Sequence, residues 1–121
     1  MIILENFCDL WLKSWTGNQP EKLLSYYHEE IIYKDPGIPQ TIKGKEDLKA
    51  YFQKLLAIYP EWIWQRKELF PLKEGFTLIW TVGEIEGMDL VILNDNKIIR
   101  NEVFFDLSNF KKTFHIRTNN A

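Results

Sequence analysis

The chain of 121 residues is poor in cysteine and in long apolar runs. Its only cysteine is Cys8, so no disulfide can form within the chain. No apolar run approaches the roughly 20 residues that a helix needs to cross a bilayer, and the N-terminus lacks the basic and apolar pattern of a signal peptide. The formal net charge of -2 leaves no positive excess for nucleic acid or for a membrane surface. We therefore expect a cytoplasmic protein that binds neither nucleic acid nor membrane.

Signals for a metal, a phosphate group or a catalytic serine are also missing. The histidines, His28 and His115, lie far apart without a third ligand at helical or hairpin spacing, which gives no metal signature. His28 is predicted near the end of a short helix, where a cation suits the negative end of the helix dipole. The 6 glycines are scattered at turns and form no phosphate-binding loop. We expect no metal and no cofactor.

Aromatic side chains, in contrast, are abundant, with 5 Trp, 8 Phe and 5 Tyr making up 15% of the residues. Large rings fill cores, and they also line pockets for flat apolar ligands. A chain of this length is sufficient for one hydrophobic core, so we expect a single domain over residues 1–121.

The periodicity of apolar residues changes near the middle of the chain. Spacing of three and four residues predicts helices over 2–16, from Pro20 onward and over 44–59. A short extended pair, over 31–34 and 41–42, separates the second helix from the third. Alternation then predicts strands over 62–70, 76–85, 88–93 and 97–106, with a hairpin turn at 94–96. This order indicates an α+β domain with three N-terminal helices packed on a strongly curved antiparallel sheet.

The first helix has a predicted apolar face formed by Ile3, Phe7, Leu10, Trp11 and Trp15. Residues on one such face pack against the rest of the domain, because burial of apolar surface stabilises the folded state.

Asp35 lies between the apolar segment 31–34 and a Pro36–Gly37 turn, and two roles fit this place. Its carboxylate orders the turn by accepting hydrogen bonds from nearby backbone amides. Alternatively, it lies at the mouth of an apolar cavity, where desolvation makes a carboxylate a better base. The sequence leaves both roles open.

Five segments carry familiar local signatures spread over most of the chain. They are residues 15–18, 27–36, 42–48, 87–89 and 96–106. In this order and spacing, they make the chain resemble the SnoaL-like branch of the nuclear-transport-factor-2-like superfamily, which includes ketosteroid isomerases and scytalone dehydratase. The resemblance implies a cone-shaped α+β fold with an internal pocket and no cofactor.

Against the ketosteroid isomerase pattern, Asp35 matches the aspartate that acts as general base. Asp89 matches the acidic residue that donates a hydrogen bond to the developing oxyanion, a match that rests on its distance from Asn94. The third element of that pattern is a tyrosine in the first helix. Its place is Leu10, with Trp11 beside it, so the tyrosine is missing and steroid isomerisation is not expected.

Two roles for Asp89 remain open. A donor at neutral pH must be protonated, which requires deep burial without a cationic partner. The other role is an ordinary carboxylate after Gly87, partly solvated at the start of a strand. If Asp89 faces the cavity, Val91 and Leu93 share its face by alternation.

Further ligand-binding candidates follow from the same match. On the last strand Asn101, Val103 and Phe105 point inward, and Asn101 either orients a ligand or is a satisfied core amide. From the N-terminal half, the candidates are Trp11, Trp15 and Tyr33.

Trp62 and Trp64 bear on whether the sheet forms an interface with a partner. Trp62 and Trp64 share a face with Arg66 and Glu68, which favours an interface over a cavity wall. The resemblance implies a homodimer through the sheet. We expect an apolar pocket for a small apolar organic molecule, serving a cofactor-free isomerase, cyclase or dehydratase with Asp35 as base. The competing expectation is a non-catalytic ligand-binding or dimeric scaffold module.

Overall fold

The computed structural model describes residues 3–108, so the prediction for His115 lies outside the described part. These residues form an α+β domain, as predicted from the sequence. The helices are α1 (Leu4–Lys13), α2 (Pro20–Leu24) and α3 (Lys45–Ile58). The strands are β1 (Tyr27–Lys34), β2 (Ile42–Lys43), β3 (Gln65–Leu72), β4 (Gly75–Val82), β5 (Ile85–Asn94) and β6 (Lys97–Phe104).

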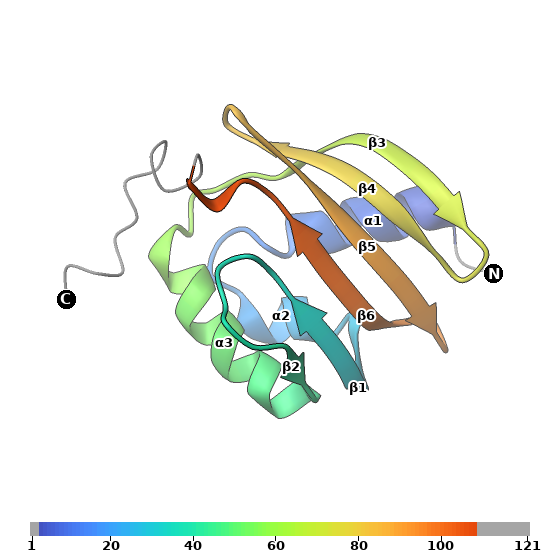
Figure 1. Cartoon of the computed structure of the whole chain (residues 1–121), viewed down its shortest axis with the longest axis horizontal. Helices are drawn as coiled ribbons and strands as arrows, with labels where there is room; N and C mark the ends of the chain where they lie inside the picture. Colours follow the sequence, from blue (N-terminus) through green and yellow to red (C-terminus); the bar gives the residue numbers. More distant parts are fainter. Residues whose placement is uncertain (1–2, 109–121) are drawn as a thin grey trace.

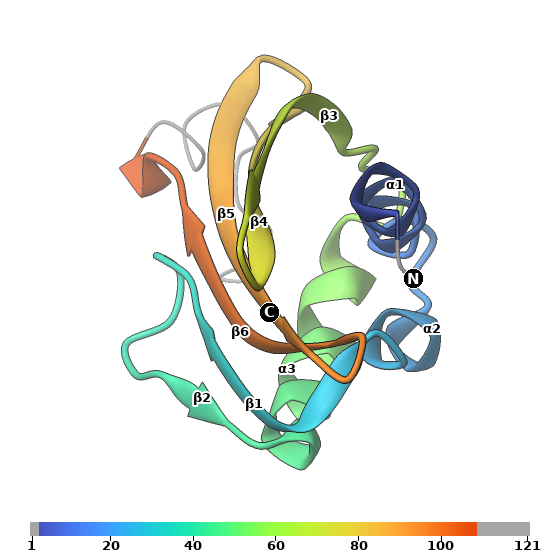
Figure 2. The ribbon, with the colours of Figure 1, turned by 90° about the vertical axis from the view of Figure 1, so that its right-hand side faces the viewer.

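The strands form one curved sheet in the order β2-β1-β6-β5-β4-β3. Neighbouring strands are antiparallel except β1 and β6, which pair in parallel. Figure 1 shows the long strands side by side, and Figure 2 shows the sheet curving around the three helices. The helices therefore cover the concave face, and the opposite face of the sheet is left uncovered by them.

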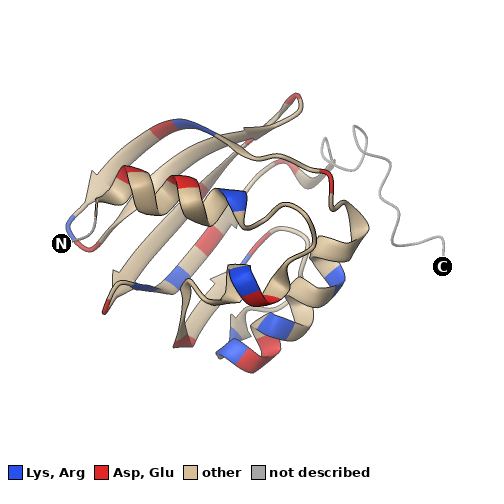
Figure 3. Ribbon diagram, turned by 180° about the vertical axis from the view of Figure 1, so that it is seen from behind, with Lys and Arg blue, Asp and Glu red and all other residues tan. Residues whose placement is uncertain are grey.

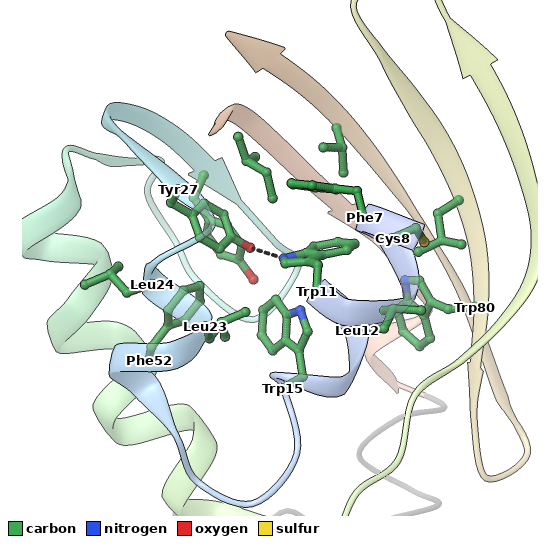
Figure 4. Close-up of a cluster of buried hydrophobic side chains, with 14 of the residues drawn as sticks. Phe7, Cys8, Trp11, Leu12, Trp15, Leu23, Leu24, Tyr27, Phe52 and Trp80 are labelled. Atoms are coloured by element: carbon green, nitrogen blue, oxygen red, sulfur yellow. Dashed lines mark hydrogen bonds between the residues drawn. The ribbon is translucent and has the colours of Figure 1, made fainter. Parts of the chain in front are cut away.

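The core lies between α1, α3 and the concave face of the sheet. Phe7, Cys8 and Trp11 of α1 are buried at helical spacing, and Phe52 of α3 and Tyr27 of β1 belong to the same core. Figure 4 shows the rings of Trp11, Tyr27 and Phe52 close together in this space. Rings that meet edge to face, such as Tyr27 and Phe52 at 61°, fill the core without parallel stacking.

The predicted apolar face of the first helix was wrong at two positions. Ile3 and Leu10 are exposed, at 62% and 56% of their surface, whereas Cys8 and Leu12 are buried. A helix turns 100° per residue, so the buried face covers one limited arc, which includes Cys8 and Leu12 but leaves Ile3 and Leu10 outside it. Trp11, which has the larger side chain of the two neighbours Leu10 and Trp11, points inward.

The end of the second helix was also placed wrongly. The helix α2 stops at Leu24, and His28 lies in β1 rather than near a helix end. Its Nδ1 accepts a hydrogen bond from the backbone N–H of Glu30 at 3.0 Å, so it does not cap a helix. Tyr27 begins the strand, where β-branched and aromatic residues are favoured.

Turn residues set the boundaries between the later strands. Gly83, at φ +58°, turns the chain between β4 and β5, so that Ile85 belongs to β5 and not to the preceding strand as predicted. The predicted turn at residues 94–96 is confirmed, because Asp95 and Asn96 have φ of 51° and 62°. Asn and Asp tolerate this left-handed region better than other side chains with a Cβ.

Acidic and basic residues are interspersed along the helices and the strands (Figure 3). Arg66 of β3 pairs with Asp9 of α1 at 2.7 Å, and Arg100 pairs with Glu102 along β6 at 2.8 Å. Such exposed pairs contribute little to stability. Within residues 3–108, none of the helices has the length and apolarity of a membrane-spanning helix.

Candidate functional site

A pocket of about 440 Å³ opens between α1, α3 and the concave face of the sheet. This volume lies in the range of small-molecule sites, roughly 300–1,000 Å³. All five tryptophans of the chain line it, together with three tyrosines and Phe105. Two acidic residues, Asp35 and Asp89, interrupt this aromatic wall, and one basic residue, Lys54, lines it from an exposed position on α3.

Asp35 follows the last residue of β1 and is 6% exposed. Its Oδ2 accepts hydrogen bonds from the Tyr33 hydroxyl at 2.8 Å and from the Tyr51 hydroxyl at 2.5 Å. Its Oδ1 accepts the backbone N–H of Gly37 at 2.7 Å. The two roles left open by the sequence are therefore not exclusive, because one oxygen orders the turn while the carboxylate also lines the pocket.

Both hydroxyls act as donors toward Asp35. Burial is the largest cause that raises the pKa of Tyr33 well above its ordinary value, and the charge of Asp35 adds to it. The pKa of Tyr51 is raised for the same two reasons. Neither tyrosine ionises near neutral pH, so each keeps the proton that it donates. The tyrosines hold the Asp35 carboxylate in one orientation.

Asp89 lies in the middle of β5 and is 3% exposed. Its Oδ1 accepts the Trp80 indole N–H at 2.7 Å, and its Oδ2 accepts the Asn101 amide at 2.9 Å. Burial raises the pKa of Asp89 from 3.8 to about 7; its two hydrogen bonds oppose the shift and the charge of Asp35 adds to it. A carboxyl with a pKa raised in this way exists in both its protonated and its ionised form near neutral pH.

A chain of hydrogen bonds behind the pocket fixes these groups. The Trp11 indole N–H donates to the Tyr27 hydroxyl at 3.1 Å, and this hydroxyl donates to Asn101 Oδ1 at 2.9 Å. The Asn101 side-chain amide in turn donates hydrogen bonds to Asp89 and, over the longer distance of 3.4 Å, to the Leu90 carbonyl. A network in which each member is bonded holds its side chains rigidly.

The sequence favoured an interface over a cavity wall for Trp62 and Trp64, but both residues line the pocket. They precede β3, in the connection that leaves α3. The Trp62 ring stacks on Tyr59 with centroids 4.1 Å apart and planes at 6°. The Thr16 hydroxyl donates to the Trp62 carbonyl at 2.6 Å and ties this connection to the end of α1. The alternation that suggested a strand from residue 62 begins before the true start of the strand at Gln65.

Residues 9–101, more than half of the chain, match the model of the SnoaL-like domain. The chain belongs to the SnoaL-like domain family. No curated protein matches the sequence.

Solved structures similar to this SnoaL-like domain share its fold at low sequence identity. An NTF2-like protein of unknown function from Burkholderia pseudomallei has a TM-score of 0.78 and 10% identity over 93% of this chain and 97% of its own. A SnoaL-like protein of unknown function from Burkholderia thailandensis has a TM-score of 0.76 and 14% identity, covering 85% of this chain and 94% of its own. A hypothetical protein with a ketosteroid isomerase-like fold from Catenulispora acidiphila, in complex with trimethylamine, has a TM-score of 0.76 and 16% identity, covering 88% and 89%.

Most ligand-binding candidates from the sequence do line the pocket of this SnoaL-like domain. These candidates are Trp11, Trp15, Tyr33, Val103 and Phe105. The exception is Asn101, which is fully buried and bonded to protein groups behind the pocket wall. It holds Asp89 in place, as the core-amide alternative predicted.

Asp89 is not the partly solvated carboxylate of the ordinary alternative. It is buried, and Val91 on the same face of β5 is fully buried as well. The helix position that the isomerase pattern fills with tyrosine is Leu10, which points outward. Trp11 beside it points inward, but its indole N–H is bonded to Tyr27 rather than directed at a ligand.

The sequence reasoning missed Tyr51 and the pocket roles of Trp62 and Trp64. Tyr51 and Leu55 on α3 and Tyr59 directly after its end follow one another at four-residue spacing, and all three line the pocket. This spacing was a visible signal for a shared face. That the Tyr51 hydroxyl reaches Asp35 was not visible, since the two residues come from different elements.

Proposed function

We propose that this SnoaL-like domain binds a small, mainly apolar organic molecule in the pocket between its helices and its sheet. The observation that carries the proposal is an aromatic pocket of about 440 Å³ whose lining includes two buried acidic side chains. Apolar walls supply affinity, and a few fixed polar groups orient the ligand. The relative from Catenulispora acidiphila is described with trimethylamine, and a small organic molecule on a protein of this fold supports the proposal.

A second candidate function is proton transfer without a cofactor, as in an isomerase, cyclase or dehydratase. The observation that favours it is the different surroundings of the two carboxylates. Asp35 is held by three donors, whereas Asp89 has two and a pKa raised to about 7 by burial. Pairs of titratable groups in unlike environments serve as base and acid. In this role Asp35 takes a proton from a carbon of the ligand, and protonated Asp89 donates a hydrogen bond to a ligand oxygen.

A thermal-shift screen of a metabolite library tests the binding function. A ligand that binds only the folded state stabilises it by about RT ln(1 + [L]/Kd), so hits need no assumption about chemistry. Hits should lose most of their effect in Trp64→Ala, which removes one pocket wall, and should keep it in Asp95→Asn, which changes one charge in the distant hairpin turn. If no compound stabilises the wild type at millimolar concentration, the binding function is wrong.

The same hits then separate catalysis from binding. A ligand incubated with the protein in deuterated water should gain deuterium at one carbon if Asp35 moves a proton, as measured by mass spectrometry. We expect Asp35→Asn to abolish the exchange even at ligand concentrations high enough to fill its pocket, so lost proton transfer is measured separately from any change in affinity. Binding without exchange in the wild type would leave a ligand-binding module and remove the enzyme role.

A further inference from the structure

The rings around the pocket present their faces in several directions. Trp15 and Trp64 meet at 46° with centroids 5.9 Å apart, and Trp62 and Trp64 meet at 71° with centroids 5.5 Å apart. The face of an aromatic ring carries the negative part of its quadrupole, and the indole of Trp is the strongest of the three aromatic side chains in attracting a cation. A pocket walled by every tryptophan of the chain therefore has a negative lining even where no charged residue stands.

The two pocket carboxylates are buried without a cationic partner. Asp35 is 6% and Asp89 3% exposed, and none of the ion pairs formed within residues 3–108 includes either of them. A buried carboxylate is usually paired with a cation, because leaving water costs free energy that hydrogen bonds alone offset only in part. Lys54, the one basic residue of the lining, is exposed. The pocket therefore has negative groups inside and its cation at the surface.

The donors next to the carboxylates are already used within the protein. Tyr33 and Tyr51 donate to Asp35, while Trp80 and Asn101 donate to Asp89. A carboxylate has about four acceptor sites. Asp35 accepts three hydrogen bonds and Asp89 two, so each of them keeps acceptor capacity. When both carboxyls are ionised, the polar groups beside them that remain for a ligand are acceptors, which suit a positively charged ligand.

We propose that the ligand of this pocket is an organic cation, a substituted ammonium carried on an apolar body. The proposal rests on the proposed binding function and names its ligand class. The alkyl groups of the ammonium contact the tryptophan faces, and the positive charge lies beside Asp35 and Asp89 in place of the missing protein cation. A neutral ligand of the same shape would fill the pocket but leave both carboxylates unpaired.

A pair of molecules that differ only in charge tests this class directly. Benzyltrimethylammonium and neopentylbenzene have the same shape, with a nitrogen in the first where the second has carbon. Each is titrated at pH 8 into the wild type, with melting temperature and calorimetric heat as readouts. We expect the cation to bind at least about tenfold more tightly, since a desolvated cation–π contact and an ion pair both act only on the charged molecule. Equal or tighter binding of the neutral molecule would overturn the cation proposal while the binding function stands.

Two variants locate the effect in the pocket. Asp35→Asn should reduce the preference for the cation about tenfold and leave binding of neopentylbenzene unchanged, and Trp64→Leu should act in the same direction through the lost ring face. Asp95→Asn is the matched control for net charge, because it removes one carboxylate from the hairpin turn, where Asn tolerates φ of 51°. If Asp95→Asn weakens the cation as much as Asp35→Asn, the charge effect is not local and the proposal is wrong. If neither molecule binds and the library gives no hit, the proposed binding function fails as well.

Discussion

At the scale of single residues, Asp89 should make the stability of the domain depend on pH. Burial raises the pKa of its carboxyl from 3.8 to about 7 in the folded state, while the unfolded chain titrates near the ordinary value. Between these pH values the folded protein keeps a proton that the unfolded chain has lost. Stability therefore decreases as pH rises through this window, by up to about 1.4 kcal/mol for each pH unit, and the loss is complete above the folded pKa.

Urea unfolding of the wild type and of Asp89→Asn at pH 5 and pH 8 measures this contribution. The wild type should lose stability relative to the variant between the two pH values, because asparagine does not titrate. Cys8 of α1, whose pKa burial raises to about 12, and Tyr27 of β1, whose pKa is raised further above 10, stay neutral throughout. Stability differences that stay the same at both pH values would show that Asp89 does not titrate in this window.

How far single residues could be predicted depends on where their partners come from. Asp35 was readable from its turn, because Gly37 is two residues away and its backbone N–H bonds the carboxylate locally. The contact with Tyr51 joins two elements across the pocket, and no local pattern in the sequence encodes it. Leu10 and Trp11 show the limit of periodicity, since both are apolar and only the packed helix decides which of them points inward.

At the scale of elements, the pairing of β4 with β5 should be sensitive to a methyl group at Gly87. This glycine lies opposite Trp80, and a Cβ there would stand 2.2 Å from the Trp80 ring. Gly87→Ala must displace the ring, with loss of the indole hydrogen bond to Asp89 and of one pocket wall. We expect a loss of about 1–3 kcal/mol in the free energy of unfolding, as for other overpacked sites, and weaker ligand binding.

The control for this variant is Glu86→Ala, at the neighbouring position on the opposite face of β5. It removes only an exposed ion pair with Lys67, and we expect a change within about 1 kcal/mol. Trp80→Phe, which has a smaller ring, should reduce the cost of Gly87→Ala in the double variant, as contacting residues couple. Additive effects of the two substitutions in urea unfolding would contradict the contact between them.

Elements were predicted well where a period was long and poorly where it was short. The 14 residues of α3 give nearly four turns of helical spacing, and the prediction matched the helix closely. The five residues of α2 give little more than one turn, so its end was placed too late. At β3 the alternating pattern began before the strand did, because Trp62 and Trp64 alternate for reasons of pocket packing rather than of strand pairing.

At the scale of the whole molecule, the α+β architecture was predictable because helical spacing gives way to alternation after Pro60, where the four long antiparallel strands begin. The pocket was not predictable in the same way. Its wall takes residues from α1, α3, the connection before β3 and four strands or strand ends, so it exists only once the sheet has curved around the helices (Figure 2). Sequence patterns report which face of an element is apolar, but not whether opposing faces meet or leave a space.

The uncovered face of the sheet is where we predict contact with a second copy of the chain. Phe104 of β6 lies opposite Met88 of β5, and both point away from the helices, at 47% and 39% exposure. Ile32 of β1 and Phe70 of β3 are also large, apolar and more than 40% exposed. Apolar groups gathered on one face of a monomer mark an interaction surface. The tryptophans do not take part, since they line the pocket on the other side.

Light scattering after size exclusion should therefore give the mass of a homodimer for the wild type at micromolar concentration. Met88→Glu together with Phe104→Glu should give a monomer, because burial of two carboxylates at the centre of an interface is costly. The double variant leaves the pocket side of the sheet intact, so it should still bind pocket ligands unless dimerisation shapes the pocket. Leu10→Glu, which adds a charge at an exposed apolar position of α1, is the matched control and should remain a dimer. A monomeric wild type would show that the chain does not dimerise. A double variant that stays dimeric would place the dimer contact elsewhere on the molecule.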